Sequence, residues 1–263
     1  MTQEFWDDRA KKFQNTPSTT LSISAHDEEY KKYKDVLQRR AVFKLLKLDK
    51  TMTVLDVGCG VGRWSFLVAP QVKKVYATDI SNEMVKIAKD IQKEKKIENI
   101  EFLQAKVEKL PVKDAQIDAA ISITVLQHVK DEDIDFAINE LARVCKSGSK
   151  VCILESTLEK ARSSYLYPRS LKKWTELFNK HNFKLVKWLP VAVLPLDELF
   201  AAGSKITNSL PDNQTKKEGK TTKQKIKQAM KSIVLNSSLP FDMYLGNTFK
   251  HKSNQKVILF EKN

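Results

Sequence analysis

Three glycines at alternate positions are the residues best suited to bring the backbone close to a ligand. Gly58, Gly60 and Gly62 follow an apolar run at residues 54–57, and a further apolar stretch fills residues 64–69. A β-branched run bounded by glycines predicts a buried strand that ends in a tight turn, and the stretch after it predicts the first turns of a helix. Backbone N–H groups in such an arrangement suit an anion or a nucleoside. The alternative is that the glycines only make a tight turn.

Two acidic residues accompany this turn. Asp79 ends the next apolar run, where a carboxylate can accept hydrogen bonds from both hydroxyls of a ribose. Asp56 lies inside the first strand, and we expect backbone N–H groups of the glycine turn to satisfy it, because a buried acid needs hydrogen-bond partners. Only one residue separates Gly60 from Gly62, where the dinucleotide fingerprint has two, so the pattern argues against a dinucleotide site.

At the sequence LDVGCGVGR the chain resembles the class I S-adenosylmethionine-dependent methyltransferases of small-molecule type. Looser similarity runs over residues 5–186. The resemblance implies S-adenosylmethionine as cofactor and S-adenosylhomocysteine as product. Nothing in the residue pattern calls for a metal. Where the family has an acid near the adenine, this chain has Lys106, so backbone at Val107 is expected to take that role with Glu108 as a helper. The implied cofactor-binding residues are Asp56, Gly58, Cys59, Gly60, Gly62, Asp79, Ile80, Val107 and Thr124.

Length and composition describe a globular protein with a substantial core. The chain has 263 residues, 41% hydrophobic and 30% charged, which allows one large domain or one domain with an appendage. No stretch reaches the ~20 apolar residues of a membrane span, and the N-terminus shows no secretion signal. Three scattered cysteines without metal-ligand spacing suit a reducing compartment. We therefore expect a cytoplasmic protein, with peripheral membrane contact as an open alternative; Cys59 as a nucleophile is the less favoured reading of that residue.

The net charge of +14 is concentrated toward the C-terminus. Half of the excess lies after Pro211, where lysines far outnumber acidic residues. A basic excess favours phosphates, nucleic acid or an anionic membrane surface as partners. The alternative is a lysine-rich surface that serves solubility.

Strand and helix patterns alternate along the chain, as a parallel sheet requires. We expect an α/β fold with a Rossmann-like, doubly wound, seven-stranded sheet and its ligand at the carboxyl ends of the strands. The resemblance adds that the last strand lies antiparallel beside the fifth. The expected strands are residues 54–57, 74–78, 100–104, 117–123, 150–154, 183–189 and 256–261.

Four regions follow from this pattern. Residues 1–50 are expected to form an N-terminal helical lid over the cofactor, and residues 51–190 the S-adenosylmethionine-binding core. Residues 191–255 form a basic insertion, interpreted as the acceptor or partner region because long loops in compact domains tend to be functional. Residues 256–263 are the last strand of the core sheet. Within the insertion, a basic amphipathic pattern near residues 226–234 could lie on an anionic membrane or pack on its own domain.

The segment after the fourth strand contains the candidate base. His128 is one of four histidines, follows a strand, and has an ordinary pKa in the working range. In the family this segment lines both cofactor and acceptor; the alternative is that His128 only positions the loop. A polar and aromatic cluster after the fifth strand lies where relatives bind acceptors, and its arginines could grip a carboxylate or phosphate. The tentative acceptor residues are Tyr30, Arg162, Tyr165, Tyr167 and Arg169.

The predicted function is methyl transfer from S-adenosylmethionine to a heteroatom, with oxygen favoured, of a small molecule that could be anionic or lipid-linked. One alternative is a tRNA, rRNA or protein methyltransferase that uses the basic C-terminal region. Nucleic acid is the less favoured partner, because the basic tract lacks interleaved aromatic residues. A third possibility is a non-catalytic cofactor-binding subunit.

Overall fold

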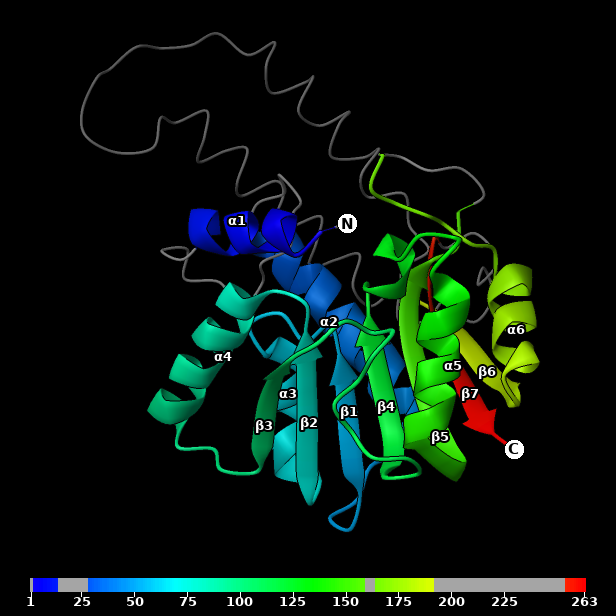
Figure 1. Ribbon diagram of the computed structural model, residues 1–263, viewed down its shortest axis with the longest axis horizontal. Coiled ribbons are helices and arrows are strands. Elements are labelled where there is room, and N and C mark those ends of the chain that lie inside the picture. Colours follow the sequence, from blue (N-terminus) through cyan, green and yellow to red (C-terminus); the bar gives the residue numbers. More distant parts are fainter. Residues whose placement is uncertain (1, 14–27, 159–163, 192–253) are drawn as a thin grey trace, which may run out of the picture.

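The computed structural model describes residues 2–13, 28–158, 164–191 and 254–263. They contain a seven-stranded sheet in the order β3-β2-β1-β4-β5-β7-β6, in which β1 to β5 run parallel and β7 pairs antiparallel with both β5 and β6 (Figure 1). This confirms the expected fold class and the antiparallel last strand. The strands are β1 Thr53–Val57, β2 Lys74–Asp79, β3 Ile100–Gln104, β4 Ile117–Ile123, β5 Cys145–Ser156, β6 Phe183–Pro190 and β7 Gln255–Lys262.

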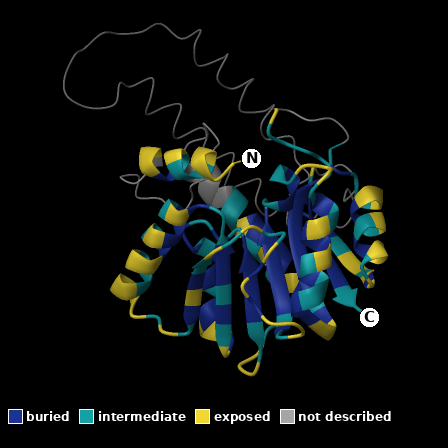
Figure 2. Cartoon of the chain, in the orientation of Figure 1, coloured by how far each residue is buried: buried dark blue, intermediate teal, exposed yellow. Residues whose placement is uncertain are grey.

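Helices cover both faces of the sheet, so β1 is buried on both sides. Val54 joins one hydrophobic cluster and the next residue, Leu55, joins the other, as expected for a strand in a doubly wound sheet. Figure 2 shows the buried strands in the centre and exposed residues on the outer sides of the helices. The helical elements described are α1 Gln3–Phe13, α2 Glu28–Leu45, α3 Arg63–Val68, η1 Ala69–Gln71, α4 Asn82–Lys95, η2 Leu126–His128, α5 Ile134–Val144 and α6 Leu171–Lys180.

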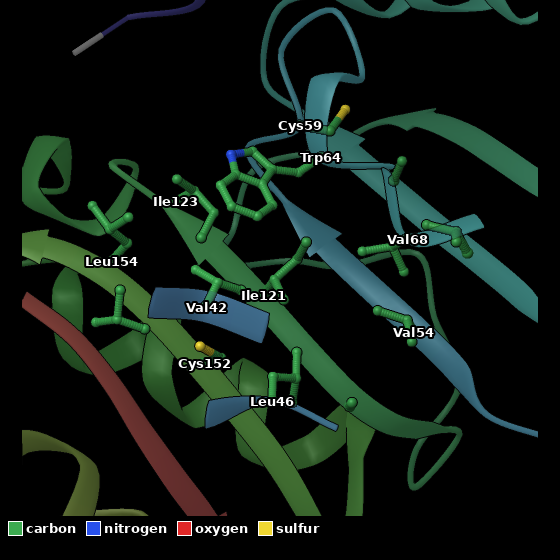
Figure 3. Close-up of a cluster of buried hydrophobic side chains, with 14 of the residues drawn as sticks. Val42, Leu46, Val54, Cys59, Trp64, Val68, Ile121, Ile123, Cys152 and Leu154 are labelled. Atoms are coloured by element: carbon green, nitrogen blue, oxygen red, sulfur yellow. The ribbon is translucent and has the colours of Figure 1, made fainter. Parts of the chain in front are cut away.

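The two clusters tie the turn-bearing strand to its supporting helices. On one face Val42 of α2 and Trp64 of α3 pack with Val54 and Ile121 of the sheet (Figure 3). The other face holds side chains of α5 and α6, among them Phe178, which is fully buried. Close packing on both faces fixes the end of β1, and therefore the position of the glycine turn.

Helix α1 lies at the carboxyl-end edge of the sheet, beside α4 (Figure 1). Ala10 of α1 is fully buried and clusters with Val61 and Met84. The helix expected at the N-terminus is therefore present, and it packs on the core next to the glycine turn. Its movement as a lid stays a prediction, and the basic insertion falls almost wholly in residues 192–253, outside the described part of the chain.

Strand β5 is longer than the sequence predicts. It begins at Cys145 rather than at residue 150. Gly148 lies within β5 with φ +78°. The serine and glycine at residues 147–148 predict instead a turn before the strand. The pairing register between β4 and β5 shifts between Ile117 and Ala119. The glycine thus accommodates an irregularity in the strand instead of preceding it.

Candidate active site

A cavity of about 1030 Å³ opens at the carboxyl ends of the parallel strands. Its wall is built from the glycine turn after β1, the end of β2, residues 105–108 after β3, and the segment after β4. Helices α1 and α2 complete it, with Trp6 and Gln38 among the lining residues. The volume is at the upper end of the range for small-molecule sites, and the position is where ligands bind in open α/β sheets.

The glycines of the turn have different surroundings. All three have positive φ, but only Gly58 and Gly60 are among the cavity-lining residues described. A Cβ on Gly58 would lie 2.3 Å from Cγ2 of Val125, whereas a Cβ on Gly60 would meet no described atom within 4 Å. A Cβ on Gly62 would lie 2.8 Å from the Phe102 ring. Gly60 therefore presents bare backbone to the cavity, while Gly58 and Gly62 allow close packing beneath it.

Asp56 does not line the cavity as the structure describes it. It is buried, and its Oδ2 accepts a hydrogen bond from Oγ of Ser65 at 2.6 Å. Burial raises its pKa to about 7, against the opposing effect of the Ser65 hydrogen bond. The expectation that N–H groups of the glycine turn satisfy this acid is wrong: Ser65, on α3, supplies the bond. Asp56 thus links β1 to the helix after the turn.

Asp79, at the end of β2, lies at the cavity and holds the glycine turn in place. Its Oδ2 accepts the N–H of Gly60 at 2.8 Å, and its Oδ1 accepts the N–H of Ser81 at 2.9 Å. Burial raises the pKa of Asp79, and these two N–H donors oppose that rise. The N–H of Ile80 is a third backbone donor to this carboxylate, so its four acceptor sites leave room for a ligand hydroxyl at one of them. The bare Gly60 backbone beside this carboxylate fits a ribose-bearing cofactor.

The other predicted cofactor residues surround the same space. Cys59, Ile80, Val107 and Thr124 all line the cavity. Burial, together with the nearby carboxylates of Asp79 and Asp56, raises the pKa of the Cys59 thiol well above its ordinary value. A thiol that stays protonated is a poor nucleophile, so the geometry does not favour a nucleophilic Cys59.

His128 lies in η2 and lines the same cavity, and a hydrogen bond sets its tautomer. Its Nδ1 is 3.0 Å from the carbonyl oxygen of Tyr165. Because a carbonyl only accepts, Nδ1 carries the proton and Nε2 keeps the lone pair in the neutral ring. Burial lowers the pKa of His128 below its ordinary value, and the bond to Tyr165 opposes this. A neutral imidazole with a free Nε2 can act as a base.

Aromatic rings enclose His128 within the cavity wall. The Trp6 ring meets His128 edge-on at 5.3 Å, and the Tyr165 ring stacks at 6.1 Å between centroids. Trp6 is brought there by α1, where Oδ1 of Asp7 accepts the Ser81 hydroxyl at 2.5 Å and the N–H of Glu83 at 3.3 Å. Helix α1 therefore contributes directly to the site.

Only one of the tentative acceptor residues reaches this cavity in the part of the chain that is described. Tyr165 lines it. Tyr167 is outside the lining set and donates its backbone N–H to the carbonyl of Gln127. Arg169 is 3% exposed and donates to backbone carbonyls and Asp131, so its guanidinium is not available to an acceptor. The Tyr30 side chain and Arg162 lie outside the described residues.

Sequence reasoning missed several residues that shape the site. Trp6 and Asp7 lie in the segment predicted to form a helical lid, but neither was predicted as a site residue. Arg63 ends the glycine motif; it lines the cavity and forms an ion pair with Asp35 of α2 at 2.5 Å. Glu155, at the end of β5, is fully buried. For Glu155 the one available signal was an acid at the end of an apolar strand.

Two kinds of feature, a metal site and a membrane-spanning helix, are absent from the described residues. No group of three or more His, Cys, Asp or Glu side chains among them is placed to hold a metal ion. None of the helices searched in those ranges is long and apolar enough to cross a membrane.

The sheet topology, the glycine turn and Asp79 together define a class I methyltransferase fold. Residues 54–148 match the family described as "Methyltransferase domain". Residues 54–148 therefore form a domain of the class I S-adenosylmethionine-dependent methyltransferase type, and S-adenosylmethionine is the cofactor of this class. The resemblance drawn from the sequence is confirmed.

Three known proteins illustrate the range of similarity. The chain is 28% identical over 156 residues to the uncharacterized methyltransferase YcgJ of Bacillus subtilis, covering 52% of this chain and 61% of that protein. It is 36% identical over 125 residues to a malonyl-(acyl-carrier protein) O-methyltransferase of Hamiltonella defensa, covering 46% and 45%. Among solved structures, the cyclase SpnF matches with a TM-score of 0.57 at 20% identity, over 88% of this chain and 80% of SpnF.

These matches limit which properties can be assigned to this chain by similarity. The chain matches between about half and three fifths of the length of these two curated relatives. SpnF, whose name describes a cyclase, shows that this fold is not confined to proteins named as methyltransferases. The reaction of the whole protein must therefore be argued from its site.

Proposed function

We propose that this chain transfers a methyl group from S-adenosylmethionine to an oxygen atom of a small molecule, with His128 as the general base. The observation that carries the proposal is the His128 imidazole, whose Nδ1 donates to the Tyr165 carbonyl at 3.0 Å while the ring lines the same cavity as Gly60 and Asp79. One cavity thus holds both a cofactor cradle and a group that can accept a proton.

The cofactor is proposed to bind in the part of the cavity that the glycine turn lines. Asp79 is proposed to accept a ribose hydroxyl, because its carboxylate keeps an acceptor site after binding the N–H groups of Gly60, Ser81 and Ile80. Backbone at Gly60 is proposed to approach the cofactor closely, since no side chain occupies that space. Residues 105–108, at the end of β3, are proposed to border the adenine, with Val107 in the place expected from sequence.

S-adenosylmethionine supplies an electrophilic methyl group when it is bound. Nε2 of His128 is proposed to accept a hydrogen bond from the acceptor hydroxyl and to take its proton. The imidazolium then returns the proton to solvent before the next turnover. Trp6 and Tyr165 pack around His128 and are proposed to exclude water from it.

The lining residues also favour a class of acceptor. The wall around His128 is aromatic, with Trp6 and Tyr165. These rings suit a small acceptor with an apolar or planar body. The name of the Hamiltonella relative specifies transfer to oxygen, which supports an oxygen acceptor here. We also propose that the protein is cytoplasmic, and the alternative is that it contacts a membrane surface peripherally.

Two variants separate the proposed roles. Asp79→Ala should weaken S-adenosylmethionine binding at least tenfold in calorimetry, while His128→Ala should bind the cofactor as the unaltered chain does but turn over about 10²- to 10⁴-fold more slowly. His181→Ala is the matched control, because His181 also bonds a neighbour, Asp135 at 3.0 Å, but lies outside the described cavity lining. Unchanged turnover in His128→Ala would refute the base assignment, and unchanged affinity in Asp79→Ala would refute the ribose assignment.

A further inference from the structure

The carboxylate of Glu155 is engaged by three consecutive backbone N–H groups. Its Oε1 accepts from Val125 at 3.1 Å and Leu126 at 2.9 Å, and its Oε2 accepts from Gln127 at 3.2 Å. Glu155 is fully buried and is outside the described cavity lining. Consecutive N–H groups that converge in this way form an anion-binding nest. Here the protein fills the nest with a carboxylate of its own.

The nest begins directly after a strained residue. Thr124 directly follows β4 and has φ +60°, a left-handed conformation that is unusual for a β-branched side chain. Its N–H donates to the carbonyl of Leu154 at 2.7 Å, and its Oγ1 donates to the carbonyl of Ile123 at 2.6 Å. Strained backbone persists only where its surroundings hold it. The bonds from Glu155 provide such a hold on the residues that follow.

Arg169 binds the carbonyl side of the same segment. Its Nη1 donates to the carbonyls of Leu126 and Tyr167, both at 3.1 Å, and its Nη2 donates to the carbonyl of Val129 at 2.8 Å. Nη2 also contacts Asp131 at 2.6 Å. Both backbone polar groups of Leu126 are therefore held, the N–H by Glu155 and the carbonyl by Arg169. Residues 125–129 will be called the post-β4 loop.

We propose that Glu155 and Arg169 are positioning residues that clamp the post-β4 loop and thereby fix the direction of the His128 imidazole at the cavity. The same clamp extends to the partner of His128, because Arg169 also binds the carbonyl of Tyr167, two residues from Tyr165. Neither residue contacts the cavity in the described structure. The importance of the clamp for turnover rests on the proposed function of His128; its effect on the direction of the ring does not.

The test uses Glu155→Gln, which keeps the side-chain volume but replaces one acceptor oxygen with an amide group that can only donate. We expect kcat to fall about 10- to 100-fold, since a small misplacement of a reacting group has effects of this size. The Kd for S-adenosylmethionine should stay within about threefold. Asp118→Asn is the matched control: Asp118 also accepts a backbone N–H, from Thr53 at 2.8 Å, and contacts a cation, Lys146, at the opposite end of the sheet.

A titration of His128 by NMR gives a readout that does not depend on turnover. In Glu155→Gln the ring should become more exposed to water, so its pKa should rise toward the ordinary value. In Asp118→Asn it should not move. An unchanged His128 titration and an unchanged kcat in Glu155→Gln would overturn the clamp. If His128→Ala kept full turnover, the base assignment would fail, and a shifted titration in Glu155→Gln would still support the clamp.

Two further measurements apply if Glu155→Gln does not fold. Arg169→Lys keeps the positive charge and leaves Glu155 in place, but an ammonium cannot span the same set of carbonyls. It should shift the His128 titration in the same direction and lower kcat by a smaller factor. In the unaltered chain, the amide protons of Leu126 and Gln127 should exchange slowly with solvent, and rapid exchange at both would overturn the clamp.

Discussion

A methyl group added at Gly60 should separate cofactor binding from stability. In Gly60→Ala the new Cβ meets no described atom within 4 Å, so the folded protein has room for it. The residue keeps φ near +55°, a conformation that costs a non-glycine residue about 1–2 kcal/mol. For a chain of this size that corresponds to a melting temperature about 2–8 °C lower.

The same methyl group points into the space that we assign to the cofactor. We therefore expect the Kd for S-adenosylmethionine to rise at least tenfold, or about 1.4 kcal/mol of binding free energy. Calorimetry measures that affinity, and differential scanning fluorimetry measures the stability. Gly148→Ala is a close control, because Gly148 has φ +78°, is exposed, and its added Cβ would also meet no described atom within 4 Å.

If Gly60→Ala binds S-adenosylmethionine as tightly as Gly148→Ala does, the proposal that the Gly60 backbone lies against the cofactor is refuted. Gly58→Ala provides a contrast. Its Cβ would overlap the Val125 side chain at 2.3 Å, so overpacking and backbone strain together should cost about 2–5 kcal/mol of stability. Gly58→Ala should therefore lose stability first and cofactor affinity only as a consequence.

Three more predictions follow from the site. Because burial lowers the pKa of His128, kcat/KM should rise with pH through a value below 6.5 and then level off. His128→Gln should lose this rise in a pH–rate profile, and a rise that persists in the variant would contradict the assignment of His128 as the base. Burial raises the folded pKa of Asp56 to about 7, so the folded chain holds a proton that the unfolded chain releases near 3.8, and stability should fall as pH rises between these values. Burial also raises the pKa of Glu155 to about 8, which acts in the same direction, so Asp56→Asn should weaken the trend and gain about 1–4 kcal/mol at pH 8 in urea unfolding; a trend of equal size in the variant would count against this account. Asp7→Ala removes the carboxylate that accepts the Ser81 hydroxyl, a hydrogen bond worth roughly 1 kcal/mol, and the loosened α1 should raise the KM for the methyl acceptor about fivefold. Asp8→Ala, at an exposed neighbouring position, should leave that KM unchanged, and equal KM values for the two variants would argue against α1 as part of the site.

The sequence was informative where one local pattern carries both the fold and the chemistry. The glycine turn and Asp79 could be placed at adjacent strand ends because parallel strands end at one edge of the sheet. His128 could be placed at the same edge because it follows β4. These residues do line one cavity.

The parts that could not be predicted depend on partners far apart in the chain. Asp56 could be recognised as a buried acid, but its partner Ser65 is chosen by the packing of α3 on the sheet. Arg169 looked like a residue for an acidic ligand, since no pattern shows that backbone carbonyls some 40 residues earlier surround it. Glu155 and the post-β4 loop meet only because β4 and β5 are neighbours in the folded sheet.

The most direct test of the central claim is the fate of the transferred methyl group. The full chain is incubated with methyl-labelled S-adenosylmethionine and host lysate, and the label is partitioned into organic, small-solute, nucleic-acid and protein fractions. We predict label in the organic or small-solute fraction, abolished by Asp79→Ala and strongly reduced by His128→Ala. Label in RNA or protein would contradict a small-molecule acceptor, and no transfer into any fraction by a chain that binds the cofactor would contradict the enzymatic role.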